Sequence, residues 1–188
     1  MIRARTYDSH SLTKGVFYHH LNKIQNLVSF YVSSNSTWSN GKWNVKKNNN
    51  NLWQYKNQNG SYFNVTFHRK MFKLSSISMK SCNINACTNR FYVYGSNQGE
   101  VWEPICYVNE SKGYFKADIS NSVCCSSFPY KTISFVLNDL NDDNNSIFTI
   151  HYIELFGTMI DEEMRIVSFI CRSRTNALGI ALIVFISS

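Results

Sequence analysis

Two tryptophans and a lysine in one polar segment are the residues whose chemistry points most directly to a ligand. Trp38, Trp43 and Lys46 lie within residues 33–51, which are otherwise rich in Asn and Ser. Tryptophan offers a large apolar face with one polar handle, which suits stacking on a sugar ring or insertion among lipid headgroups. A neighbouring lysine suits an anionic headgroup. The alternative is structural: each tryptophan fills one end of the fold, and the basic, Asn-rich segment is simply solvated.

The sequence shows none of the patterns that are typical of a catalytic site. It has no nucleophile elbow, no phosphate-binding P-loop, no dinucleotide-binding fingerprint and no His-Glu metalloprotease motif. Pairs of carboxylates are also scarce in the first 80 residues, where Asp8 is the single acidic residue. We therefore expect a protein that is not an enzyme and has no catalytic residues.

Residues that bind metals are present, but their spacing is unfavourable. The adjacent His19 and His20 fall in an expected helix, where neighbouring side chains point about 100° apart and chelate poorly together. The six cysteines nowhere show the CxxC spacing of a zinc knuckle. The acidic segment 138–146 lacks the Gly and the terminal Glu of an EF-hand loop. The sequence thus predicts no metal and no cofactor.

Positive charge is concentrated in the first part of the chain. Residues 1–80 contain 12 Lys and Arg against one acidic residue, a balance of +11, whereas residues 81–188 contain 7 against 11, a balance of −4. A basic segment attracts anionic partners such as phospholipid, sulfated glycan or nucleic acid. The alternative is that strands from both halves alternate in one sandwich, so that the asymmetry largely cancels in space. We expect no nucleic acid partner.

The stretch that organises the chain is residues 91–105, FYVYGSNQGEVWEPI. Phe and Val alternate with two tyrosines over residues 91–94, which is the period of a half-buried strand. Residues 95–99 then supply Gly, Ser and Asn, which tolerate turns and positive φ. We predict a strand, a tight turn bounded by glycines, and a tryptophan, Trp102, that returns to the core.

Further elements follow from the same kind of pattern. Residues 12–21 place apolar side chains at helical spacing and predict a short amphipathic helix, whereas the polar residues 1–10 are expected to be loosely attached. The apolar set slips by one residue within residues 148–157, which indicates a bulge or bend. Other strands are predicted at residues 27–32, 62–67, 72–80, 114–117 and 132–137.

Three pieces of the chain together resemble the discoidin domain, also called the coagulation factor V/VIII type C domain. Residues 91–105 resemble its central hairpin, where an aromatic-rich strand leads into Gly-Ser-Asn-Asp-Gly and a following Trp, although Gln98 stands where the family most often has Asp. Residues 150–157, IHYIELFG, are similar to its final strand, which typically ends Ile-Glu-Leu-Phe-Gly. Residues 53–67, WQYKNQNGSYFNVTF, resemble its early Trp and the strand after it. The pieces occur in the family's order.

The resemblance implies an all-β, galactose-binding-like fold. This is a discoidin-like jelly-roll β-sandwich or barrel of about eight antiparallel strands, with a short N-terminal helix. We expect residues 28–159 to form this domain, residues 1–27 to be an N-terminal extension that contains the helix, and residues 160–188 to be a tail. The family position of Trp53 is inside the sandwich.

The resemblance also implies a class of function. Discoidin domains are non-catalytic recognition modules, so a glycan, an anionic phospholipid or membrane surface, or a protein is the expected partner. Their ligands bind at loops at one end of the sandwich, where residues 33–51 are expected, so Trp38, Trp43 and Lys46 are the candidate ligand-binding residues. The alternative is an intracellular adaptor or scaffold domain that binds no small ligand. Exposed tryptophans with lysines around them favour ligand binding, and buried ones favour the scaffold.

Two features favour a cytoplasmic location. Residues 1–20 have no apolar core of a signal peptide, and no cysteine precedes Cys82. The disulfide that commonly joins the two ends of secreted discoidin domains therefore cannot form, which favours a reducing environment. The alternative is membrane association through the C-terminal tail, although its uninterrupted apolar run, residues 177–188, is shorter than the roughly 20 residues that span a bilayer.

Overall fold

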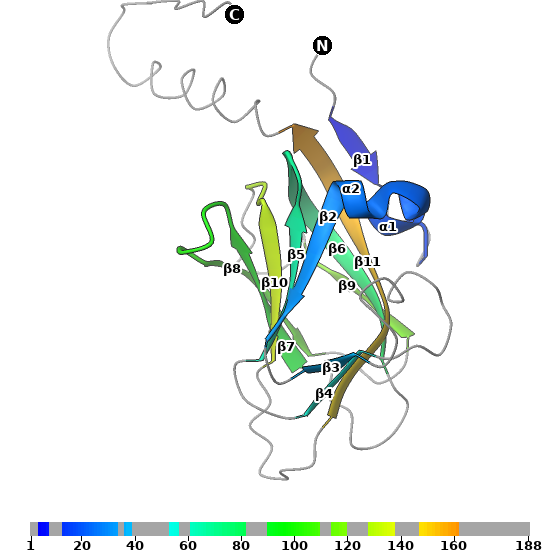
Figure 1. The fold of residues 1–188 in the computed structure, drawn as a ribbon, viewed down its shortest axis with the longest axis vertical. Helices are drawn as coiled ribbons and strands as arrows, with labels where there is room; N and C mark the ends of the chain where they lie inside the picture. The colour runs from blue at the N-terminus through cyan, green and yellow to red at the C-terminus, as the bar shows by residue number, and fades with distance from the viewer. Residues whose placement is uncertain are drawn as a thin grey trace, which may run out of the picture.

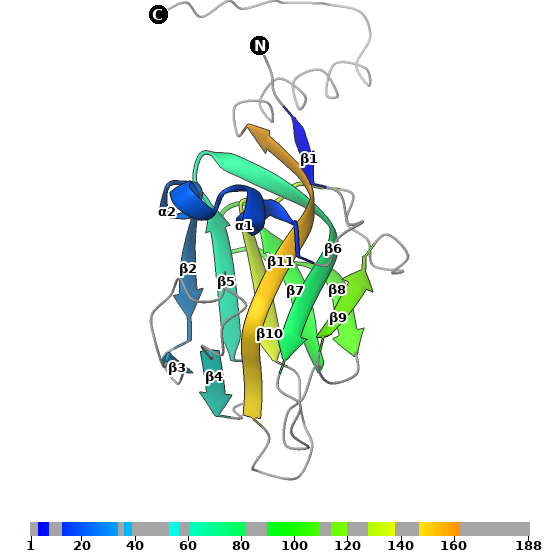
Figure 2. The same ribbon diagram turned by 90° about the vertical axis from the view of Figure 1, so that its right-hand side faces the viewer.

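Two antiparallel β-sheets face each other and enclose one hydrophobic core (Figures 1 and 2). The computed structural model describes residues 4–7, 13–33, 36–38, 53–56, 61–81, 90–109, 114–119, 128–137 and 147–161. The all-β sandwich expected from the sequence is confirmed. Within the described residues the chain forms eleven strands rather than about eight, because short strands such as β1 and β3 add to the ends of the sheets.

The larger sheet has six strands, in the order β3-β4-β11-β6-β9, and β1 also pairs with β11. Its strands are β1 (Arg5–Tyr7), β3 (Ser36–Trp38), β4 (Trp53–Lys56), β6 (Lys70–Ser81), β9 (Tyr114–Asp118) and β11 (Ile147–Asp161). The smaller sheet has five strands, in the order β2-β5-β10-β7-β8. Its strands are β2 (Val28–Val32), β5 (Tyr62–Phe67), β7 (Arg90–Ser96), β8 (Glu103–Asn109) and β10 (Thr132–Leu137).

The core follows from the alternation in the strands. On β5, Phe63, Val65 and Phe67 are fully buried, whereas their neighbours point to the opposite face of the sheet. Phe63 stacks on Phe30 of β2, with 5.5 Å between ring centroids, and packs against Phe135 of β10 at 5.9 Å. Burial of each such side chain contributes about 1.5–3 kcal/mol. Because these side chains are buried on the inner face of the sheet, their neighbours along each strand are fixed on the outer face.

The closing strand β11 contains the irregularities that its sequence indicates. Its pairing with β6 shifts register between Ile150 and Tyr152 and again between Phe156 and Gly157. Gly157 has φ +146°, and a Cβ there would collide with the backbone carbonyl oxygen of Lys73. The predicted slip is confirmed, and the second shift requires glycine.

The segment before β2 packs into the core of the sandwich. It forms α1 (Val16–His19), a 3-10 turn (Leu21–Lys23) and α2 (Ile24–Leu27) at the end of the sandwich that also carries β1 (Figures 1 and 2). Val16, Phe17 and Ile24 are buried in the core. The expectation that residues 1–10 are loosely attached is wrong for Arg5–Tyr7, because this strand pairs with β11 and adds main-chain hydrogen bonds to its edge.

A buried carboxyl group attaches α1 to β11. Glu154 is 1% exposed, and its two oxygens accept the backbone N–H groups of Phe17 and Tyr18 at 3.0 and 2.7 Å. Burial raises the pKa of the Glu154 carboxyl to about 8, although these hydrogen bonds act in the opposite direction. A side chain at Gly15 would collide with this carboxylate. The acid expected in the final strand therefore has a structural role.

Candidate binding face

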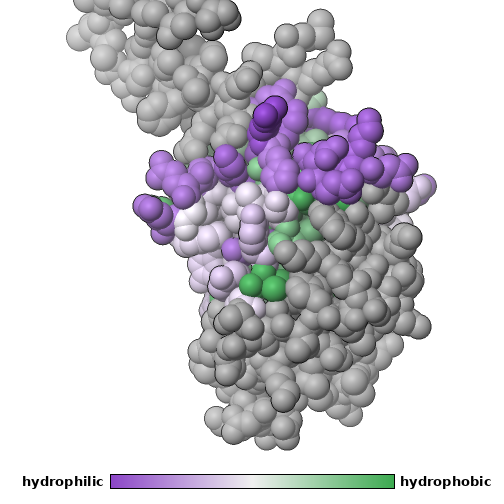
Figure 3. Space-filling model, in the orientation of Figure 1, coloured by the Kyte–Doolittle hydropathy of each residue, from purple (hydrophilic) through white to green (hydrophobic). Residues whose placement is uncertain are grey.

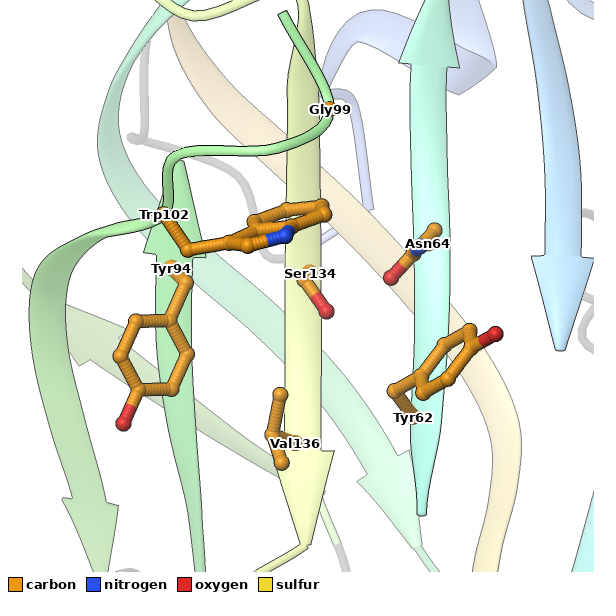
Figure 4. A pocket seen from close by; sticks show the side chains of 7 residues that line it. All are labelled: Tyr62, Asn64, Tyr94, Gly99, Trp102, Ser134 and Val136. Carbon is orange, nitrogen blue, oxygen red and sulfur yellow. The ribbon is translucent and has the colours of Figure 1, made fainter. Parts of the chain in front are cut away.

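A pocket lies on the outer face of the five-stranded sheet, away from the core (Figure 4). Its volume is about 590 Å³. Strands β5, β7 and β10 form its floor, and the loop between β7 and β8 overhangs it. Its lining residues are Tyr62, Asn64, Tyr94, Gly99, Trp102, Ser134 and Val136.

Strand alternation and register bring the floor residues together. Tyr62 and Asn64 are the outward neighbours of the buried phenylalanine of β5. Pairing places Asn64 opposite Ser134 and Ser134 opposite Tyr94, so these three side chains form one row across β5, β10 and β7. Tyr62 and Val136 face each other in the next row. A register slip of one residue would turn this whole set into the core.

The loop between β7 and β8 is held by side chains of its own sequence. Ser96 Oγ accepts the backbone N–H of Gly99 at 2.8 Å. Asn97 Oδ1 accepts the N–H of Lys131 at 2.9 Å, and its amide donates to the carbonyl of Pro129 at 3.4 Å. These bonds fasten the loop to the segment that precedes β10. Gly99 has φ +81°, so the predicted glycine turn is confirmed.

Trp102 does not return to the core, and that prediction is wrong. The side chain is 38% exposed, and its indole extends over Ser134 on β10 (Figure 4). Residues 101–104 are exposed, and the first buried residue after the turn is Ile105. The core on this side is already filled by residues of β7, β8 and β10, among them Val93, Ile105 and Ile133. The tryptophan therefore becomes a wall of the pocket.

One polar atom in this pocket has no hydrogen-bond partner among the described residues. Asn64 Oδ1 is buried and accepts no hydrogen bond from any of them. Figure 4 shows Asn64 and Ser134 directed into the hollow between Trp102 and Tyr62. A buried acceptor without a donor costs about 1–3 kcal/mol, so such atoms call for an explanation. A ligand that donates a hydroxyl group to Asn64 would satisfy it.

The pocket is uncharged. The described residues that line it supply aromatic rings, one amide, one hydroxyl, a valine and a glycine, and none of them is Asp, Glu, Lys or Arg. Figure 3 shows strongly hydrophilic residues along the end of the molecule that carries α1 and α2, and paler colours below it. A charged ligand would find no side chain of opposite charge among these residues. The chemistry suits a neutral molecule that has both apolar faces and hydroxyl groups.

The predicted ligand-binding residues are not among the described residues that line this pocket. Trp38 belongs to β3 of the six-stranded sheet and pairs with Trp53, but the structure does not describe its side chain. Trp43 and Lys46 lie outside the described residues. These three assignments stay predictions. The signal in the sequence for the pocket residues is the alternation in residues 62–67 and 132–137, which gives their outward positions but not the pocket that these positions form.

Histidines and acids do not gather into a metal site in the part of the chain that the structure describes. His20 Nε2 is hydrogen-bonded to the hydroxyl of Tyr7 at 2.5 Å, which gives one member of the His19-His20 pair a structural partner. Burial lowers the pKa of His20, and the positive charge of Arg5 adds to this effect. Among the described helices, none is long and apolar enough to cross a membrane.

No family model and no curated protein matches the chain. Solved structures do. CBM32-3 from a family 31 glycoside hydrolase of Clostridium perfringens is 15% identical, with a TM-score of 0.52 over 70% of this chain and 92% of that one. The family 32 module of C. perfringens NanJ, solved in complex with galactose, is 12% identical, with a TM-score of 0.52 over 70% and 95%. The C. perfringens module CpGH89CBM32-5, in complex with GalNAc-β-1,3-galactose, is 10% identical, with a TM-score of 0.53 over 71% and 97%.

These similarities cover almost the whole of each module and most of the present chain. At identities of 10–15% they establish the fold. Family 32 modules are discoidin-like domains, so the resemblance seen in the sequence is confirmed at this level. The chain has the discoidin, or galactose-binding-like, β-sandwich fold.

Proposed function

We propose that this chain is a non-catalytic glycan-binding module that holds a neutral sugar in the pocket on its five-stranded sheet. The observation that carries the proposal is the buried, unpartnered Asn64 Oδ1, set between the aromatic side chains of Trp102 and Tyr62. Satisfied by a hydroxyl group of a ligand, this oxygen becomes a specific contact rather than a cost.

The chemistry of the pocket matches the two kinds of surface on a sugar. The C–H faces of the ring stack on aromatic side chains such as the indole of Trp102. The hydroxyl groups at the ring edge both donate and accept, so they suit the amide of Asn64 and the hydroxyl of Ser134. Small-molecule sites are usually lined by apolar and aromatic side chains, with a few polar groups that orient the ligand.

The structural neighbours support the class of ligand. One is named as a complex with galactose and another as a complex with GalNAc-β-1,3-galactose. The same neighbours support a role without catalysis, since they are carbohydrate-binding modules. An anionic phospholipid would find no basic residue among the described residues that line this pocket, so we favour a sugar over a lipid headgroup here.

The proposal is tested by a glycan array with the full chain, followed by titration of each bound sugar and of galactose by tryptophan fluorescence. Trp102→Ala and Asn64→Ala should each weaken binding about tenfold or more, equivalent to about 1.4 kcal/mol. Val101→Ala is the matched control, because Val101 is 63% exposed beside Trp102 and does not line the pocket. Loss of binding in Trp43→Ala, with Trp102→Ala unaffected, would move the site to the segment of residues 33–51.

A further inference from the structure

Tyrosines continue beyond the pocket to both edges of the five-stranded sheet. Tyr31 lies on β2, one edge strand, and Tyr107 lies on β8, the other. They are 55% and 46% exposed. Of the seven large hydrophobic side chains exposed among the described residues, four belong to this face: Tyr31, Tyr62, Trp102 and Tyr107. Scattered exposed aromatic side chains need no explanation, but a contiguous band of them does. We call the rings that extend from Tyr31 to Tyr107 across this face the band.

The register of the strands aligns the band. Tyr62 pairs with Val136, Val136 with Tyr92, and Tyr92 with Tyr107, so one row of outward side chains crosses β5, β10, β7 and β8. Neighbouring strands lie about 4.8 Å apart, so this row is roughly 14 Å long. Tyr31 pairs with Asn64 and extends the adjacent row to the opposite edge.

The band has a second aromatic group outside the pocket. The rings of Tyr92 and Tyr107 lie 4.9 Å apart and tilted by 44°, and Tyr92 also contacts Tyr94 at 6.0 Å. Tyr94 lines the pocket, whereas Tyr92 and Tyr107 do not. The tyrosines therefore form a continuous connection from the pocket to the edge of the sheet at β8.

Between these rings the face is polar and uncharged. Its outward residues on the central strands are Asn64 and Thr66 on β5, and Thr132, Ser134 and Val136 on β10. Thr66 and Thr132 are already hydrogen-bonded to each other at 3.0 Å, which leaves the polar contacts of Asn64 and Ser134 for a ligand. On the five strands of this sheet, the charged residues are Arg90, the first residue of β7, and Glu103, the first residue of β8. The band thus repeats the chemistry of the pocket.

We infer that this face binds an internal stretch of a neutral oligosaccharide, laid across the strands, with one sugar in the pocket and others on Tyr107 and Tyr31. The inference rests on the proposed function and adds the length and direction of the ligand. A single hexose contacts only the pocket. Each further sugar stacks on another ring, so affinity rises with chain length until the band is filled.

The experiment measures affinity along two series of probes by titration calorimetry. One series is galactose and β-1,4-linked galactose chains of two to four residues, and the other is glucose and the cello-oligosaccharides of the same lengths. In one series the full chain should bind the tetrasaccharide at least tenfold more tightly than the monosaccharide. Tyr107→Ala should lower this ratio at least threefold, and Tyr107→Phe, which keeps the ring, should restore it.

Phe128→Ala is the matched control, because Phe128 is 53% exposed but outside the band. It should leave the ratio unchanged. Monosaccharide binding that Trp102→Ala abolishes, with no gain along either series, would overturn the extended site and leave the proposed function standing. Absence of binding to every probe and to a glycan array, by protein shown to be folded from its near-UV circular dichroism, would overturn both.

Discussion

At the scale of single residues, we expect a substitution of Asn64 to raise the stability of the fold and to abolish sugar binding. Its buried oxygen has no partner, so Asn64→Leu, which replaces the amide by an apolar group of similar size, removes a cost of about 1–3 kcal/mol. We predict a melting temperature about 2–12 °C higher, from about 2–4 °C per kcal/mol for a chain of this length, together with loss of sugar binding.

Thr66→Val is the control for this change, because Thr66 is an outward residue on the same strand but has a hydrogen-bonded hydroxyl. It should lower the melting temperature. If Asn64→Leu also lowers it, the oxygen has a partner in solution, and its use by a ligand loses support. Differential scanning calorimetry distinguishes the two results.

Glu154 gives stability a dependence on pH. Because burial raises its folded pKa from 4.5 to about 8, the folded state holds a proton that the unfolded state has lost between these values. Stability therefore falls as pH rises through this window, by up to about 1.4 kcal/mol per pH unit. Glu154→Gln, which resembles the protonated form, should flatten the slope in urea unfolding measured from pH 5 to 8.

His20 changes the stability of the fold with pH in the opposite direction to Glu154. Its lowered folded pKa means that its contribution is lost as pH falls below 6.5. The difference between the wild type and Glu154→Gln isolates the carboxyl, since His20 is common to both. Asp118→Asn, on an exposed residue, is the control. Equal slopes in wild type and Glu154→Gln would contradict the prediction.

At the scale of elements, two glycines of the described residues have positive φ, for different structural reasons. Gly157 stands at a register shift of β11, where a Cβ would collide with the carbonyl of Lys73, whereas Gly99 has open space around it. We predict that Gly157→Ala costs about 3 kcal/mol or more, from backbone strain and overlap together, and that Gly99→Ala costs about 1 kcal/mol. Chemical unfolding measures both, and equal costs would show that β6 yields at this point.

At the scale of the whole molecule, the segment before β2 completes the core. A chain that begins at residue 22 loses Val16 and Phe17, which are fully buried, and also the partners of Glu154. We predict loss of cooperative unfolding, because this exposes Phe30, which packs on Phe17 at 5.6 Å, and removes two of the hydrogen bonds of a buried acid.

A chain that begins at residue 11 retains α1 and loses only β1, so it is the matched comparison. It should unfold cooperatively with a modestly lower midpoint in calorimetry. Equal stability of the chains beginning at residues 11 and 22 would show that the domain starts at β2.

The sequence by itself determined the fold class and most of the strands. Alternation in residues 62–67 and 132–137 states which side chains are buried, because the period of a strand is set by its own backbone. It also indicated the slip in β11 and the glycine turn after β7. Local chemistry is sufficient for these features, since each depends on residues close together in the chain.

Only the tertiary structure decided where the candidate site lies. Periodicity gives the face of each side chain but not which strands are neighbours, so it did not bring Asn64 to Ser134, 70 positions later in the chain. Trp102 is apolar enough for a core, and it stays outside because other side chains already fill that space. The attachment of α1 to Glu154 likewise depends on residues 136 and 137 positions apart. Such long-range pairings are set by packing of the whole chain, which no local pattern contains.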